Sequence, residues 1–305
     1  MKLFSKNYLI VIAVLIGMFA YFSILSSYAS QTYQIAGIAL IFGLAIGSFL
    51  NVLIYRLPIM LENQWQKDCA EFLGQSIPEK PIFNLTRPAS ACPHCQSLVQ
   101  AWQNIPIISF LILRGKCANC HNKISWQYVS VETLTGLFFM LLALKLGLSY
   151  SFAAYVVLIS LLIALAVIDL NSHLLPDVIT LPLIWLGLLV NYFDVIVDLE
   201  TAFLGTLLGY LILYVVANLF FWITKREGMG AGDFKLLAAL GAWLGWHQLP
   251  LIIFLSAGCS ALVGLILIWR NKMTWQTPQA FGPYLVGAAG VSIFLDDYLP
   301  IWHWI

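Results

Sequence analysis

The sequence predicts an all-α polytopic membrane protein, and two observations carry that prediction. Of 305 residues, 61% are hydrophobic and 10% charged, against about 45–50% apolar and about 25% charged in a soluble domain. The apolar residues form runs of about 20, long enough for membrane helices, rather than the alternating segments of a barrel. The composition excludes a soluble enzyme, a disordered chain and a secreted disulfide scaffold. The net charge of +1 gives no basis for a nucleic-acid partner.

About nine transmembrane helices are expected. The first segment, Tyr8 to Ala29, could be a signal-peptide core, but Ser-Tyr-Ala before Ser30 is a poor cleavage site and favours a retained helix. A short segment, Phe234 to Trp246, carries Lys235. The other seven run from Ile35 to Tyr55, Val129 to Leu148, Phe152 to Ile168, Ile179 to Val197, Phe203 to Thr224, Leu249 to Trp269 and Phe281 to Leu299.

The distribution of basic residues predicts the orientation. Lys and Arg in short loops collect on the cytoplasmic side. With the N-terminus inside and nine spans, thirteen of the 15 basic residues fall inside. Lys145 lies near the outer face and Lys235 within the membrane region. The prediction is therefore an inside start and an outside finish.

One long segment between the second and third helices has ordinary polarity. Residues 57–128 contain no apolar span, which predicts a small cytoplasmic domain. We expect residues 1–33 to form the N-terminal helix, 34–56 the next helix, 57–128 the inserted domain and 129–305 a polytopic core. No solenoid-type repeat is visible.

Two Cys-x-x-Cys pairs lie in the inserted domain, at Cys92 with Cys95 and at Cys117 with Cys120. Four thiolates at this spacing can bind one tetrahedral Zn²⁺. A segment of about 70 residues gains little from apolar burial, so a structural metal would stabilise it. Two disulfides or a redox-active pair are the alternatives. We expect His94 and His121 to be spectators, and Cys69 and Cys259 have no matching partner.

Ionisable residues inside membrane segments are rare and are functional hypotheses by default. Asp169 ends the segment Phe152 to Ile168, and Asp233 begins the segment after Lys225. The predicted topology brings both to the same depth near the cytoplasmic face. Two close carboxylates share one proton, so one can accept a proton from water while the other polarises a carbonyl. The sequence therefore predicts an aspartic hydrolase pair. The alternative is that each aspartate only caps a helix.

Three further charged residues have simpler interpretations. Asp177 follows Pro176 and is expected to be an N-cap. Glu132 near the start of its helix is interpreted as a capping or polar-pocket residue. Lys235 is expected to reach the interface or to balance local charge.

An ordered set of short strings resembles the type IV prepilin peptidases, bifunctional leader peptidases and N-methyltransferases of bacterial inner membranes. The strings run through roughly four fifths of the chain. They are Gly47-Ser-Phe-Leu-Asn-Val52, Arg56-Leu-Pro58, Pro88-Ala-Ser-Ala-Cys-Pro-His-Cys95, Asn104-Ile-Pro106, Arg114-Gly-Lys-Cys117, Leu175-Pro-Asp177, Gly230-Ala-Gly-Asp233 and Phe281-Gly-Pro-Tyr284.

The resemblance implies specific roles. Asp169 and Asp233 match the catalytic aspartates, the second within a Gly-x-Gly-Asp signature. Cys92, Cys95, Cys117 and Cys120 match the family's tetracysteine motif. Such proteins cut prepilin and pseudopilin leaders after a glycine on the cytoplasmic side, then methylate the new N-terminus with S-adenosylmethionine. Gly115 and Lys116 are the weakly supported candidates for the methyl-donor site.

Other functions fit parts of the sequence. Where the family usually has Arg-Tyr-Pro, this chain has Gln127-Tyr-Val129 before Glu132, so a monofunctional peptidase is one alternative. A proton-coupled transporter with an aspartate relay is a second, although carboxylates near one face and the lack of a repeat disfavour it. A zinc-bearing membrane adaptor is a third. Nothing in the sequence indicates an oligomeric state.

Overall fold

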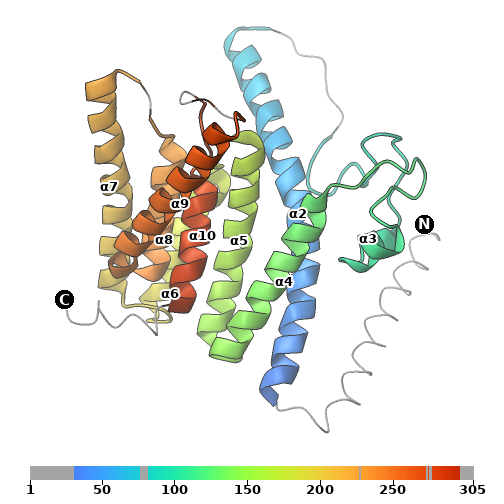
Figure 1. Cartoon of the computed structure of the whole chain (residues 1–305), viewed down its shortest axis with the longest axis horizontal. Coiled ribbons are helices and arrows are strands. Elements are labelled where there is room, and N and C mark those ends of the chain that lie inside the picture. Colours follow the sequence, from blue (N-terminus) through green and yellow to red (C-terminus); the bar gives the residue numbers. More distant parts are fainter. Residues whose placement is uncertain (1–30, 76–81, 227, 273, 275–276, 296–305) are drawn as a thin grey trace. The chain divides into compact units, whose positions relative to one another are not determined.

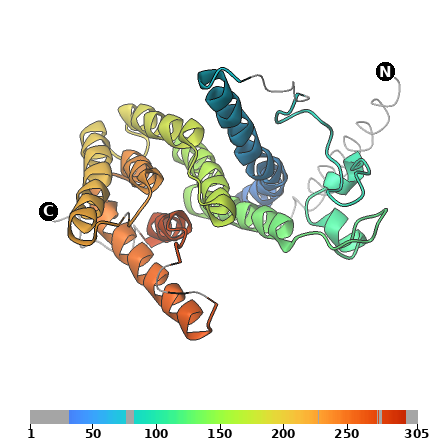
Figure 2. The same cartoon turned by 90° about the horizontal axis from the view of Figure 1, so that it is seen from above.

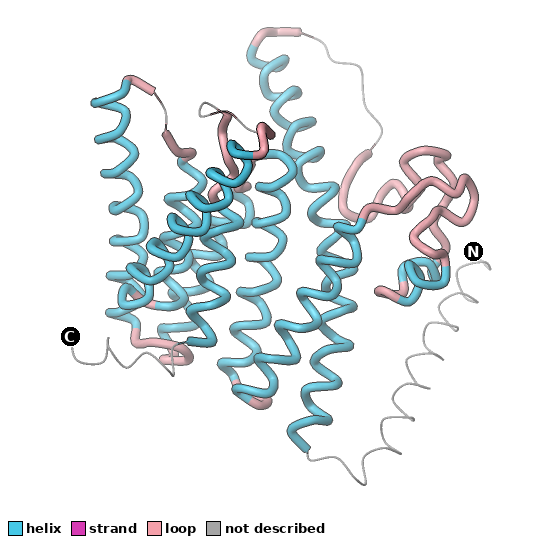
Figure 3. The backbone as a smooth tube through the Cα atoms, viewed as in Figure 1, coloured by secondary structure: helices cyan, strands magenta, loops and turns pink. Residues whose placement is uncertain are grey.

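The computed structural model describes residues 31–75, 82–226, 228–272, 274 and 277–295. Within these residues, helices are joined by loops and no strand is present; two isolated β-bridges occur. The backbone tube in Figure 3 shows the longest loop-rich region between α2 and α4. The all-helical fold class is therefore confirmed. The predicted helix Tyr8 to Ala29 lies outside the described residues. Each of the other eight predicted segments overlaps a described helix, although the one predicted from Ile179 to Val197 ends at Tyr192.

The chain divides into two compact units, residues 1–156 and 157–305. The first contains α2 (Gln31–Phe72), η1 (Ala101–Asn104), α3 (Ile108–Ile112), α4 (Trp126–Leu146) and the start of α5 (Tyr150–Ser172). The second contains the rest of α5, followed by α6 (Asp177–Tyr192), α7 (Leu199–Thr224), α8 (Ala231–Leu244), η2 (Trp246–Gln248), α9 (Leu249–Trp269) and α10 (Gly282–Leu295).

In the first unit, α2 and α4 pack closely along their length (Figure 1, blue and green). Small residues permit the close approach. A Cβ on Gly43 would lie 2.8 Å from the Cα of Gly136, and a Cβ on Gly47 would lie 2.7 Å from the Cα of Glu132. Backbone contact of this kind is typical of helix pairs in membranes, where van der Waals packing drives association.

Helix α2 is longer than the apolar segment that predicted it. The segment was expected to end at Tyr55, but the helix continues past Pro58 to Phe72. The extension is polar, and hydropathy alone does not detect it. Contacts one turn apart support it: the Gln64 side chain donates to Asp68 at 2.7 Å.

In the second unit, α8 is the central buried helix, packed against both α6 and α7 (Figures 1 and 2). A Cβ on Gly209 of α7 would lie 2.6 Å from the carbonyl oxygen of Leu237 on α8. Phe234 contacts the rings of Tyr210 and Tyr214 edge to face at 6.0 and 6.3 Å. Tight packing on both sides therefore fixes the position of α8.

The C-terminal end of α8 is held by α6 through polar groups. The amide nitrogen of the fully buried Asn191 donates to the carbonyls of Ala242 at 2.8 Å and Trp243 at 3.1 Å. Its amide oxygen accepts from the backbone nitrogens of Ile196 and Val197, each at 3.2 Å. The Trp243 indole donates to the carbonyl of Leu183 at 2.8 Å.

Five helical segments of the described chain are long and apolar enough to cross a membrane. They are α2, α4, α5, α7 and Trp246–Trp269. Helices α6 and α10 are shorter apolar helices, and α8 has 14 residues with Asp233 in its first turn. The protein is therefore a multi-pass membrane protein by length and composition. The expected number of nine spans stays a prediction.

Candidate active site and metal centre

Asp169 lies near the end of α5, and its side chain reaches the beginning of α10. The helix continues to Ser172, so Asp169 lies within its last turn. Its Oδ2 accepts a hydrogen bond from the backbone nitrogen of Gly282, the first residue of α10, at 2.9 Å. The side chain is buried, with 5% of the residue exposed. The N-terminus of α10 is thus satisfied by a carboxylate.

Asp233 is the third residue of α8 and is also buried, with 8% exposed. Gly230 precedes the helix, and the Asp233 backbone nitrogen donates to the Gly230 carbonyl at 3.2 Å. The Oδ1 atom of Asp233 is buried and has no hydrogen-bond partner among the described residues. The charge of Asp169 acts on Asp233 electrostatically. The fold therefore brings the two predicted aspartates into interaction within one unit.

Leu175 lies between the helices that carry these groups. A Cβ added to Gly232 on α8 would lie 2.8 Å from the Cβ of Leu175. A Cβ added to Gly282 on α10 would lie 3.3 Å from Leu175 Cδ2 and 2.7 Å from Asp169 Oδ2. The two glycines therefore make room for one leucine and one carboxylate. These packing roles of Leu175 and Gly282 were not predicted from the sequence.

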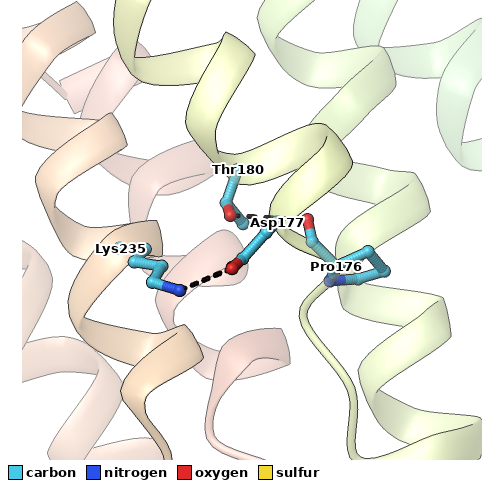
Figure 4. A network of polar contacts seen from close by, with 4 residues as sticks. All are labelled: Pro176, Asp177, Thr180 and Lys235. Atoms are coloured by element: carbon cyan, nitrogen blue, oxygen red, sulfur yellow. Dashed lines mark hydrogen bonds and ion pairs between the residues drawn. The ribbon is translucent and has the colours of Figure 1, made fainter. Parts of the chain in front are cut away.

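Asp177 and Lys235 form an ion pair beside the aspartates, shown in Figure 4. Lys235 Nζ lies 2.7 Å from each carboxylate oxygen of Asp177. The expectation that Asp177 is an N-cap is wrong: Pro176 is the cap residue of α6, and Asp177 is its first helical residue. The carboxylate points to Lys235 because a cation on α8 is available. Of the two roles considered for Lys235, the ion pair with Asp177 shows local charge balance.

The arrangement suits acid–base chemistry at a water molecule. Two interacting carboxylates in a poorly solvated site cannot both carry charge cheaply, so such a pair can share one proton. The ionised group can then deprotonate water, and the neutral group can donate a hydrogen bond to a carbonyl oxygen. Gly230 lies next to Asp233 Oδ2 with no other heavy atom within 4 Å of a Cβ built there, so no side chain crowds that oxygen from this position.

The four cysteines form two similar turns in the first unit. Cys92 N donates to Ser97 O at 2.9 Å, and Cys117 N donates to Asn122 O at 2.8 Å. The residue after each second cysteine has a positive φ, 56° at Gln96 and 58° at His121. The turns are therefore built alike, and each presents two thiols on one side.

The thiol geometry fits a tetrahedral metal. All four Sγ atoms lie within 4.8 Å of one another. Cys92 Sγ is 3.8 Å from Cys120 Sγ, and Cys95 Sγ is 4.0 Å from Cys117 Sγ. Tetrahedral Zn–S bonds of about 2.3 Å place sulfurs about 3.8 Å apart. The cysteines are free thiols, which excludes the disulfide alternative here. Side-chain and backbone hydrogen bonds with Ser97 lower the pKa of the Cys95 thiol to about 6, which favours the thiolate that a metal needs.

A buried arginine on α2 anchors the segment that precedes the first cysteine turn. Arg56 donates to the carbonyls of Asn84 and Pro88, both at 2.8 Å. Gly115 closes α3, with φ of 68° and its nitrogen bonded to the Phe110 carbonyl. The backbone of Lys116 forms an isolated β-bridge with Lys123, next to the turn that carries Cys117 and Cys120. Both residues have structural positions, and their assignment to a methyl-donor site stays a prediction.

Glu132 contacts a loop rather than a helix end. Ser125 caps α4, and Glu132 lies two turns further on, with 8% exposed. Its Oε2 accepts from the backbone nitrogen of Ile107 at 2.8 Å. Of the two interpretations of Glu132, the polar pocket is correct and the helix cap is not.

These features define a multi-pass helical membrane protein whose described part contains two buried, interacting aspartates and a cluster of four cysteines that could hold a metal ion. Two family models match the chain: the bacterial peptidase A24 N-terminal domain over residues 41–146, and the type IV leader peptidase family over residues 156–266. The chain belongs to the type IV leader peptidase family.

Curated relatives agree with this family. A protein named prepilin leader peptidase/N-methyltransferase from Stutzerimonas stutzeri is 47% identical over 264 residues, covering 86% of this chain and 91% of the relative. Relatives of the same name are 46% identical in Pseudomonas putida, covering 85% and 90%, and 41% identical in Legionella pneumophila, covering 92% and 97%. No solved structure matches the chain.

Proposed function

We propose that this protein is a prepilin leader peptidase that also N-methylates its product. It removes leaders from type IV prepilins and pseudopilins after a glycine, then methylates the new N-terminal residue. The observation that carries the proposal is the interaction of Asp169 with Asp233 in a buried site next to Gly282. Family membership and relatives whose printed name states both activities support it.

Cleavage uses the two aspartates as a pair. The ionised carboxylate takes a proton from water, and the hydroxide oxygen adds to the scissile carbonyl carbon. The protonated carboxylate donates to the carbonyl oxygen, whose negative charge grows as the bond forms. The peptide C–N bond then breaks, and the leaving amine takes a proton from the pair. One water is consumed, and a leader acid and a free amine result.

The methyl-transfer step acts on the amine that cleavage exposes. S-adenosylmethionine supplies an activated methyl group bound to a sulfonium. The free amine must be held unprotonated and close to that methyl. The printed name of the relatives supports this second activity.

The four-cysteine centre holds a structural Zn²⁺ in this proposal. Cys92, Cys95, Cys117 and Cys120 supply four thiolates at distances that fit tetrahedral coordination. The metal would hold the two cysteine turns together, in a region that has few buried apolar side chains to stabilise it. It takes no part in peptide cleavage, which depends on residues of the other unit.

The proposed site of action is the cytoplasmic side of the bacterial inner membrane. The support is the distribution of Lys and Arg, since thirteen of 15 fall on one side in the nine-span arrangement. Asp169, Asp233 and residues 57–128 lie on that side, where a newly made prepilin presents its leader.

Mass spectrometry of a synthetic prepilin peptide tests the proposal. The peptide has a leader ending in Lys-Gly followed by Phe, and it is incubated with full-length protein in detergent and S-adenosylmethionine. We expect cleavage after Gly and the addition of one methyl group to the new N-terminal Phe. Cleavage without methylation would leave a monofunctional peptidase. A folded protein that cuts no prepilin peptide would contradict the proposal.

A further inference from the structure

A second buried polar cluster lies in the first unit, away from the aspartate pair in sequence and in unit. It is formed by Ser48 and Asn51 on α2, Glu132 on α4, and the loop Asn104–Ile107. Helices α2 and α4 are the blue and green helices of Figure 1. Asn51 is 4% exposed and Glu132 is 8% exposed. The cluster therefore has two buried side chains, whereas the contact between Ser48 and Asn104 at its edge is exposed.

Both buried side chains have unused acceptor capacity. The Asn51 amide nitrogen donates to the Tyr128 carbonyl at 3.1 Å, but its Oδ1 is buried and has no partner. Glu132 accepts from the Ile107 backbone nitrogen and lies beside the Ser48 hydroxyl. No cation in the described part of the chain pairs with Glu132. Buried acceptors are normally hydrogen-bonded and buried carboxylates normally paired with a cation. The Oδ1 atom of Asn51 therefore calls for a donor that the described residues do not provide. Glu132, which accepts from Ile107 and Ser48, has no cation paired with it among these residues.

The loop at the cluster is held in a strained shape. Ile107 has φ of 59° and ψ of −47°, an outlier for a β-branched residue. Ile108 N donates to Pro106 O at 2.5 Å, which closes a three-residue turn of the rare kind. Ser48 also donates to the Asn104 carbonyl at 3.3 Å. The loop is thus positioned against the acceptors by contacts to both helices.

We infer that Glu132 and Asn51 form a binding site for a positively charged group in the methyl-transfer reaction. This inference rests on the proposed function. Both reactants of that step can present such a group: the methyl donor has a sulfonium and an ammonium, and the N-terminal amine of the cut pilin is an ammonium until it loses the proton that blocks methyl transfer. An anionic acceptor beside a neutral one matches a cation with hydrogen-bond donors.

The first variant separates charge from structure. Glu132→Gln keeps an oxygen that can accept from Ile107 but removes the negative charge. Glu71→Gln is the matched control, because Glu71 is an exposed glutamate on α2 in the same unit. Equilibrium dialysis with radiolabelled S-adenosylmethionine gives its Kd. Methylation of a pre-cut peptide gives kcat and the KM of each reactant.

For Glu132→Gln we expect a rise of about tenfold or more, either in the Kd and KM of S-adenosylmethionine or in the KM of the peptide. For Glu71→Gln we expect the same constants as for the unmodified protein. A rise in the Kd and KM of S-adenosylmethionine identifies the donor as the occupant. A rise only in the KM of the peptide identifies the amine. Asn51→Ala removes the unpartnered acceptor, and the same constant rises by less. A fall in kcat alone in both variants would indicate a structural role and overturn the inference.

Failure of the inference and failure of the proposed function give different results. If the unmodified protein methylates the peptide and Glu132→Gln leaves every constant unchanged, the inference alone is wrong. If the unmodified protein cuts prepilin but neither binds S-adenosylmethionine nor methylates, the methyltransferase part of the proposed function is wrong, and this site falls with it.

Discussion

The carboxylate of Asp169 accepts a hydrogen bond from the backbone nitrogen of Gly282, 113 residues later in the chain, at 2.9 Å. The contact joins the end of α5 to the first residue of α10. It fixes one oxygen of Asp169 and leaves the other for chemistry. Because a backbone nitrogen makes the bond, the position of Asp169 depends on helix packing and on the absence of a side chain at residue 282.

Gly282→Ala is expected to impair cleavage. A Cβ there would lie 2.7 Å from Asp169 Oδ2, so the carboxylate or the helix must move. A displaced catalytic group can lower the rate by about 100-fold. The check is kcat/KM for prepilin peptide cleavage. Gly287→Ala on the same helix is the control, because a Cβ there meets nothing within 4 Å. Equal activity of the two variants would show that the contact is dispensable.

The glycines before Asp233 are expected to differ in their tolerance of alanine. At Gly232 a Cβ would lie 2.8 Å from Leu175 Cβ, a rigid neighbour, whereas at Gly230 the nearest atom is 4.0 Å away. Gly232→Ala should therefore lower cleavage by about tenfold or more through movement of α8, and Gly230→Ala should be close to the unmodified protein. Parallel assays of both variants check this. The reverse order of activities would contradict the packing argument.

Asn191→Ala is expected to destabilise the second unit. Fully buried Asn191 bonds four backbone groups, and its loss leaves them without partners. A buried group left unsatisfied costs roughly 1–3 kcal/mol. Thermal unfolding in detergent measures the effect. Asn218→Ala provides the comparison, since Asn218 is half-buried and donates to the carbonyl of Tyr214 one turn away in the same helix. If both variants have the same Tm, the hydrogen bonds of Asn191 do not hold α8 in place.

Metal content is expected to depend on four of the six cysteines. Cys92→Ser removes one of four thiolates and should abolish stoichiometric zinc in the purified protein, because three ligands leave the site open. Cys69→Ser and Cys259→Ser should retain it, since both cysteines are exposed and lie outside the cluster. Elemental analysis of these three variants and of the unmodified protein measures the zinc content. Zinc retained by Cys92→Ser, or none in the unmodified protein, would contradict the assignment.

Much of this architecture could be predicted from the sequence because lipid imposes a simple rule: apolar runs of about 20 residues become helices. The rule failed where a helical segment is polar rather than apolar. The polar part of α2 up to Phe72 is helical but not apolar, so hydropathy did not detect it. The knuckle spacing likewise predicted a four-thiol cluster, because metal coordination constrains local sequence.

What the sequence did not predict depends on contacts between distant segments. Asp177 was expected to cap α6, but Lys235, 58 residues away, attracts its carboxylate. The bond from Gly282 to Asp169 and the contact of Glu132 with Ile107 also join remote positions. No local pattern encodes such pairings. The two aspartates could be proposed from their depth in the predicted topology, whereas their surroundings required the fold.

The most direct test of the account is cleavage of a prepilin peptide by Asp169→Asn and Asp233→Asn, each compared with Asp194→Asn, an aspartate outside the pair. Asparagine keeps the shape of the side chain and removes the ionisable carboxyl group. The account predicts that both pair variants lose cleavage while keeping the thermal stability and zinc content of the unmodified protein, and that Asp194→Asn cleaves normally. Normal cleavage by either pair variant would contradict the two-aspartate mechanism.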